Sequence, residues 1–194
     1  MGYMDLETII LIISGIIFFS WGSLLLIKRK LMVSAIFINI LSSVISIYSF
    51  TTISELMPQL GILLIILSFG GLIILFHRGK HMVYGVNTNM ISDILKDILR
   101  EERISYEEKE SLFVLKDYDD ISIEYKKSSD CVSLDLKDIK KLHFYDIIKD
   151  ETKIRIEEIE ENLFPKSAIM YILSGLGLLL FTLYFRRIFI SSNV

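Results

Sequence analysis

The sequence predicts a polytopic α-helical membrane protein with four transmembrane helices, and a small α+β domain inserted between the third and fourth helices. The 194 residues are 52% hydrophobic with a mean hydropathy of +0.52, too apolar for an ordinary soluble domain. This excess lies in four blocks that contain no Asp, Glu, Lys or Arg: 9–27, 31–53, 60–76 and 168–185. All but three of the 24 acidic residues lie between the third and fourth blocks.

The apolar blocks have the length of membrane helices. Roughly 19 helical residues cross the hydrocarbon core of a bilayer, about 30 Å thick. We therefore expect three transmembrane helices in residues 1–80, over about 9–27, 31–53 and 58–76, and a fourth with a short tail in 166–194. Pro58 suits the first turn of the third helix, where its missing N–H costs nothing. The first block is preceded by the acidic leader MGYMDLE, which favours a retained anchor over a cleaved signal peptide.

The distribution of basic residues predicts the orientation, since Lys and Arg in short loops stay in the cytoplasm. In the favoured orientation only two basic residues near the membrane lie outside, Arg186 and Arg187. The six that lie inside are Lys28, Arg29, Lys30, Arg78, Lys80 and Lys166. We expect a multi-pass protein of the cell membrane with both termini extracytoplasmic and residues 81–165 cytoplasmic. The residues predicted to contact headgroups at the membrane surface are Lys28, Arg29, Lys30, Arg78 and Lys80.

Residues 81–165 are predicted to form an acidic α+β domain of order β-α-β-β-β-α. Between Met82 and Lys166 there are 21 acidic and 14 basic residues. Strands are expected at 82–86, 111–117, 121–127 and 131–136, where apolar and polar residues largely alternate. Residues from 138 onward read as a second helix. The first helix is predicted because its apolar residues recur at helical spacing: Ile91, Ile94, Leu95, Ile98 and Leu99. Its expected N-terminal cap is Asn87, Thr88 or Asn89.

A polar stripe crosses the second apolar block. It consists of Asn39, Ser42, Ser46 and Ser49, at helical spacing. One interpretation is helix packing, because small and hydroxyl side chains allow close approach and hydrogen bonds between helices. The alternative is part of a substrate or ion path. Packing is favoured because the blocks contain no ionisable residue.

Catalytic, metal and cofactor motifs are not found in the sequence. His77 and His81 are spaced i and i+4, but two ligands do not close a zinc site and Gly79 lies between them. His143 and Cys131 are the remaining candidates for catalysis, without a partner that the sequence identifies. We therefore predict no catalytic, cofactor-binding or metal-binding residues. An acidic domain also argues against nucleic acid as a partner.

The function predicted from these features is that of a non-enzymatic integral membrane protein. Its cytoplasmic α+β domain would be a protein-interaction or regulatory module, as in an adaptor, an immunity-like protein or an accessory subunit. The expected partners are the lipid bilayer and either another protein or further copies of the chain. A subunit of a transport or channel assembly is the first alternative, and a membrane enzyme is the second.

Overall fold

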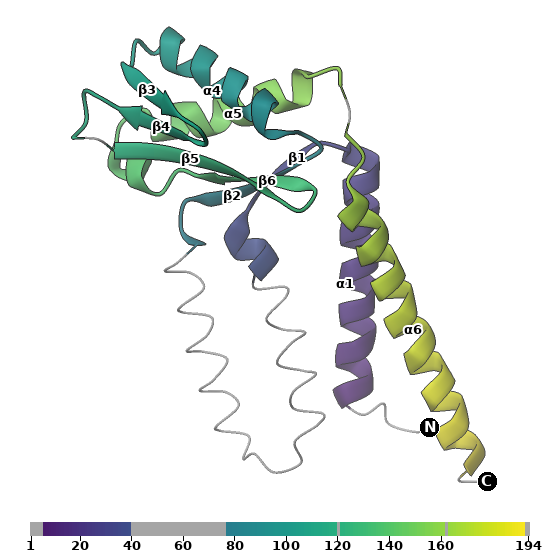
Figure 1. Ribbon diagram of the computed structural model, residues 1–194. Coiled ribbons are helices and arrows are strands. Elements are labelled where there is room, and N and C mark those ends of the chain that lie inside the picture. The colour runs from purple at the N-terminus through teal and green to yellow at the C-terminus, as the bar shows by residue number, and fades with distance from the viewer. Residues whose placement is uncertain (1–5, 40–76, 120, 162, 193–194) are drawn as a thin grey trace, which may run out of the picture. The chain divides into compact units, whose positions relative to one another are not determined.

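The computed structural model describes residues 6–39, 77–119, 121–161 and 163–192 (Figure 1). The chain divides into two compact units. One contains residues 1–29 and 164–194, and the other contains residues 30–163.

The first unit is a pair of long antiparallel helices, α1 (Leu6–Lys28) and α6 (Lys166–Ser192). We call this pair the helical hairpin, although the second unit separates its two helices in the sequence. Small residues occupy the line where the helices meet. Gly15 lies against Gly175, and Gly22 lies against the backbone of Ala168. The two residues of each helix are seven positions apart, which returns them to the same face. Glycine is required here because a Cβ at Gly175 would lie 2.6 Å from the backbone nitrogen of Phe19.

The outward faces of this hairpin are apolar along their length. Ile16 is 51% exposed in α1, and Leu180 is 65% exposed in α6. Within the described residues, two segments are long and apolar enough to cross a membrane, Leu11–Lys28 and Lys166–Tyr184. Helices of 23 and 27 residues are also sufficient in length, since about 20 residues span the hydrocarbon core.

The second unit is an α+β fold built on a six-stranded antiparallel sheet, with the strand order β1-β2-β6-β5-β4-β3. Each strand is short and pairs in a defined register with its neighbours. The strands are β1 (Leu31–Ser34), β2 (Lys80–Tyr84), β3 (Tyr106–Lys109), β4 (Leu112–Leu115), β5 (Ile121–Ser128) and β6 (Cys131–Asp135).

One face of the sheet carries the hydrophobic core. Helices α4 (Thr88–Glu101) and α5 (Tyr145–Glu158) lie side by side over it (Figure 1). A 3₁₀ helix, η1 (Asp138–Lys141), contributes buried Ile139 to the same core. Phe113, Ile123 and Leu134 project from the sheet into this core and are fully buried. A single covered face agrees with the alternation of apolar and polar residues in β5.

Helix α4 confirms the helical pattern of the sequence. All five apolar residues predicted to share its inner face are buried. Asn87 is the cap among the three candidates, because its side-chain oxygen accepts a hydrogen bond from the backbone N–H of Met90 at 2.9 Å.

The prediction of a four-helix membrane protein is wrong. The described residues contain two candidate spans and a six-stranded antiparallel sheet. Leu31–Ser34 was assigned to the second transmembrane helix but forms β1, which pairs with β2. A short apolar run is compatible with either a helix or a buried strand, and the pairing with β2 decides it. The rest of that block beyond residue 39, and the predicted helix over 58–76, lie outside the described residues.

The predicted order β-α-β-β-β-α is also wrong, because it lacks two strands. One is β1, contributed from before the predicted domain. The other is β3, whose sequence YEEK has no apolar alternation and therefore carries no strand signal. It is held as an edge strand by its pairing with β4. The second predicted helix is divided into η1 and α5.

The packing of α1 against α6 can be tested with one pair of variants. We expect Gly175→Ala to destabilise the hairpin by about 1–3 kcal/mol, as overpacking does, because the added methyl meets backbone atoms that cannot move aside. Gly177→Ala is the matched control, since nothing lies within 4 Å of a Cβ there. Thermal unfolding of the full chain in detergent, followed by circular dichroism, measures both. Equal unfolding temperatures for the two variants would contradict the packing described.

Candidate functional site

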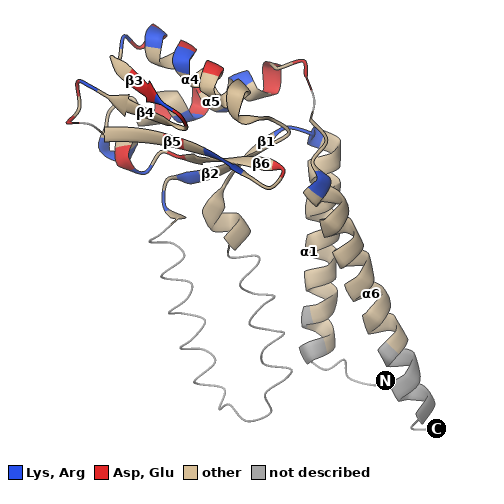
Figure 2. Cartoon of the chain, in the orientation of Figure 1, with Lys and Arg blue, Asp and Glu red and all other residues tan. Residues whose placement is uncertain are grey.

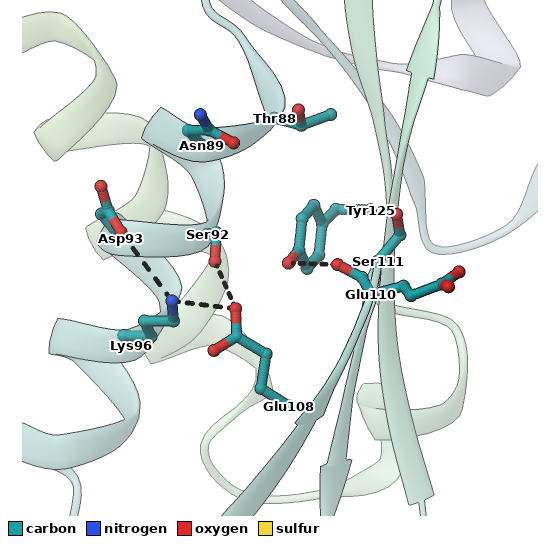
Figure 3. A pocket seen from close by; sticks show the side chains of 9 residues that line it. All are labelled: Thr88, Asn89, Ser92, Asp93, Lys96, Glu108, Glu110, Ser111 and Tyr125. Carbon is teal, nitrogen blue, oxygen red and sulfur yellow. Dashed lines mark hydrogen bonds and ion pairs between the residues drawn. The ribbon is translucent and has the colours of Figure 1, made fainter.

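The described residues contain a polar cleft between α4 and the β3–β4 hairpin, with a volume of about 340 Å³ (Figure 3). Its lining comes from the N-terminal part of α4, from β3 and the β3–β4 turn, and from β5. The residues are Thr88, Asn89, Ser92, Asp93, Lys96, Glu108, Glu110, Ser111 and Tyr125.

Glu108 is the best-anchored carboxylate of the cleft. Lys96 donates to its Oε1 at 2.8 Å, and the hydroxyl of Ser92 donates to the same oxygen at 3.1 Å. The hydrogen bond from Lys96 is the main cause that lowers the pKa of Glu108, and the same bond raises the pKa of Lys96. Both groups are therefore charged at neutral pH. The second oxygen of Glu108 takes part in neither bond and remains able to accept a donor.

Tyr125 positions the turn that forms the opposite side of the cleft. Its phenolic O–H donates to the backbone carbonyl of Glu110 at 3.1 Å, and its backbone N–H donates to the carbonyl of Ser111 at 2.9 Å. Glu110 has a positive φ of 38°, a conformation that needs such support in a residue with a side chain. The cleft is thus shaped by hydrogen bonds from a buried strand.

The charge of the cleft indicates what it can hold. Asp93, Glu108 and Glu110 carry three negative charges, and Lys96 carries the one positive charge among the lining residues. A carboxylate with a free oxygen next to hydroxyl groups accepts hydrogen bonds from a guanidinium or ammonium group. The sequence did not predict this site, because its residues come from α4, the β3–β4 hairpin and β5, and β3 was itself missed.

The predicted headgroup residues lie at the connections between elements. Lys28 is the last residue of α1, and Arg29 follows with a φ of 54°. Lys30 is only 6% exposed. Arg78 is exposed in the turn before β2, and Lys80 in β2 forms an ion pair with Asp135 at 3.0 Å. Their contact with lipid headgroups stays a prediction.

The structure describes one residue of the predicted polar stripe, Asn39. Asn39 donates from its side-chain amide to the carbonyl of Ala35, at 2.7 Å, within its own helical turn. Ser42, Ser46 and Ser49 lie outside the described residues. Both the packing and the path interpretations of the stripe therefore stay predictions.

The two histidines with metal-like spacing do not share a helix. Residue 77 is helical, whereas Gly79 turns the chain with a φ of 89° and His81 lies in β2. Across the ranges that the structure describes, no three His, Cys, Asp or Glu side chains gather as a metal site would require.

Cys131 and His143 occupy different environments. Cys131 is buried in β6, donates its S–H to the carbonyl of Ser128 at 2.9 Å, and has its pKa raised to about 11, mainly by burial. A thiol with this pKa is a poor nucleophile at neutral pH, because the thiolate is the reactive form. His143 is exposed, and its ring meets the edge of Phe144.

Comparison with known proteins gives no relative: no protein family matches the chain, and no curated protein or solved structure is similar to it.

His81, a half-buried residue of β2, is expected to make the stability of the second unit depend on pH. Burial is the main cause that lowers its pKa below 6.5, and the charges of Lys149 and Lys140 lower it further while Asp135 opposes them. Its Nε2 is buried without a hydrogen-bond partner among the described residues. As the pH falls below about 6.5, the unfolded chain takes up the proton first, so stability decreases.

Chemical unfolding of the full chain in detergent at pH 7.5 and pH 5.5 measures this effect. The wild type should lose stability at the lower pH, and a His81→Leu variant should lose markedly less. An equal loss in both proteins would show that His81 is not the group responsible.

Proposed function

We propose that the chain is a non-enzymatic integral membrane protein whose α+β unit binds a basic segment of a protein partner. Helices α1 and α6 would form the anchor, and the cleft between α4 and the β3–β4 hairpin would form the contact site. The observation that carries the proposal is this cleft, whose polar lining combines three carboxylates, among them the ionised Glu108, with one lysine.

The anchor is supported by what the hairpin presents on its surface. Ile13, Leu173 and Leu183 are each at least half exposed, and they belong to a much longer series of apolar side chains on α1 and α6. In water such a continuous apolar surface is unfavourable by about 25 cal/mol per Å², and contact with lipid removes this cost. The helices have already satisfied their backbone hydrogen bonds internally, as a membrane interior demands.

The orientation that we propose places β1 and the described residues 77–161 of the α+β unit in the cytoplasm. Basic residues at the end of α1 and the start of α6 include Lys28, Arg29 and Lys166, whereas Arg186 and Arg187 lie toward the other end of α6. The excess of positive charge is retained on the cytoplasmic side. Both termini would then be extracytoplasmic.

Recognition of a basic partner is supported by the composition of the cleft. A guanidinium group in the cleft would meet carboxylates of its lining, such as Glu108, and the lining also provides the hydroxyl groups of Ser111 and Thr88. A charge-assisted bond of this kind contributes about 1.5–3 kcal/mol. Ser92 and Lys96 hold Glu108 in place beforehand, so little side-chain freedom is lost on binding.

Anchoring and orientation can be tested by chemical labelling. Buried Cys131 would resist thiol reagents on either side of the membrane, so a new cysteine at exposed Glu102 is needed, in a Cys131→Ser background. We expect Glu102→Cys to react with an impermeant maleimide only after the cells are opened. The protein should remain in the membrane fraction at alkaline pH.

Labelling of intact cells at that cysteine would reverse the proposed orientation. Release of the protein by alkaline carbonate would contradict the anchor itself. A cysteine at exposed Lys153, on another part of the same unit, provides an independent check on the sidedness.

Partner binding at the cleft can be tested by photocrosslinking in cells. A benzoylphenylalanine at exposed Asn89, on the rim of the cleft, should give a discrete adduct with one protein. We expect an Asp93→Asn, Glu110→Gln double variant to weaken this adduct at least tenfold, because it removes two of the three negative charges of the lining. Adduct mass by mass spectrometry distinguishes a partner protein from a second copy of the chain.

The matched control carries the same crosslinker at Glu157, which is exposed on α5. The same adduct from both positions would indicate unspecific proximity. Absence of an adduct from position 89, or insensitivity to the charge removal, would contradict the cleft as the contact site.

A further inference from the structure

We propose that the α+β unit carries a second membrane contact, a basic corner that binds anionic lipid headgroups. The corner consists of Arg78, Lys137, Lys140 and Lys141. This inference rests on the membrane anchoring proposed above, and it adds three lysines that the sequence did not connect with the membrane.

The corner exists because two distant segments pack against each other. The backbone N–H of Leu136 donates to the carbonyl of Gly79 at 2.9 Å. A Cβ on Gly79 would lie 2.8 Å from the Cα of Lys137, and the φ of 89° at Gly79 also favours glycine. The turn that contains Arg78 therefore lies directly beside the segment that leads into η1.

Strand pairing strengthens this junction. Lys80 is opposite Asp135 in the β2–β6 register, and their side chains form an ion pair at 3.0 Å. Asp135 also accepts a hydrogen bond from the backbone N–H of Lys137, at 3.0 Å. The sheet therefore fixes the positions of the turn that contains Arg78 and of the segment that begins at Lys137.

The charge of the corner is not neutralised locally. Of the ion pairs found in the described residues, none engages Arg78, Lys137, Lys140 or Lys141, whereas Lys96, Lys149 and Arg155 each pair with carboxylates. Arg78, Lys137 and Lys141 are exposed, and Lys140 is half-buried. Asp138 is the acidic residue within η1, so the corner keeps a net positive charge on a unit with an excess of acidic residues. Figure 2 shows basic positions, coloured blue on the ribbon, at the start of β2.

Connectivity favours a lipid surface over a diffusing ligand. Arg29 and Lys30 are the whole connection between α1 and β1, and β1 pairs with β2. The second connection leaves the unit nearby: the backbone N–H of Leu163 donates to the carbonyl of Gly85, which follows Tyr84, the partner of Leu31 in the β1–β2 register. A short tether raises the effective concentration of the membrane surface around the corner. Each lysine close to an anionic leaflet then contributes roughly a fivefold preference for the docked state, about 1 kcal/mol.

The test uses the full chain in lipid nanodiscs and measures energy transfer to labelled lipids. A donor dye is attached at His143→Cys, just after η1, in the Cys131→Ser background, and the discs contain acceptor-labelled lipid. We expect higher transfer in discs that contain phosphatidylglycerol than in discs of phosphatidylcholine alone, and we expect high salt to remove the difference.

The decisive comparison is between two triple variants with the same change in net charge. Lys137→Gln, Lys140→Gln, Lys141→Gln should lower the ratio of docked to undocked protein about a hundredfold, because three fivefold contributions are lost. Arg100→Gln, Lys109→Gln, Lys153→Gln, at exposed positions on α4, β3 and α5, should leave it unchanged.

The outcomes separate this inference from the proposed function. Transfer that is independent of phosphatidylglycerol, or equal losses in both triple variants, would overturn the basic corner while leaving the anchor intact. Loss of the wild type from the membrane in alkaline carbonate would overturn the anchor first. Binding of a labelled single-stranded oligonucleotide by the three lysines, without a response to lipid, would assign the corner to nucleic acid instead.

Discussion

The pairing of β1 with β2 is the interaction on which the rest of the α+β unit depends. Four residues that follow α1 almost directly pair from Leu31↔Tyr84 to Ser34↔His81. Because β2 then has a neighbour on each side, Val83 becomes fully buried and His81 is enclosed. The same pairing satisfies the backbone of a strand that would otherwise expose unpaired N–H and C=O groups. The pairing also links two basic segments through the sheet. The basic end of α1 leads into β1 by a two-residue connection, and the turn at Arg78 leads directly into β2.

The one-sided core explains where chemistry can occur in this unit. Helices α4 and α5 cover one face with closely packed side chains, so polar groups are displaced to its edges. At the β3 edge they form the cleft around Glu108, and at the start of β2 they form the basic corner. Opposite charges are thus separated within one small unit. In the arrangement that we propose, this separation would allow the acidic unit to lie near a negatively charged membrane and still present carboxylates to a basic partner.

The parts of the fold that could be predicted are those with a regular local pattern. Helix α4 was recognised from its 3.6-residue periodicity, and β5 and β6 from their alternation, because each buries one face. By contrast, the first three residues of Leu31–Ser34 are all apolar and Tyr106–Lys109 is mostly charged, so neither run alternates. Their strand conformation comes from hydrogen bonds to β2 and β4, which no short window of sequence contains. The cleft was missed for the same reason, because Glu108 meets Lys96 only when β3 forms.

The sequence by itself determined that four blocks are apolar and contain no Asp, Glu, Lys or Arg, that acidic residues concentrate between residues 82 and 166, and that α4 has one apolar face. These are properties of composition and local spacing, which do not depend on distant residues. The tertiary structure alone decided that the sheet has six strands, that Ser92 and Lys96 hold Glu108, and that Gly79 brings Arg78 beside Lys137. Each of these arrangements requires a register or a close backbone approach between segments far apart in the chain, and such contacts form only when the whole unit folds.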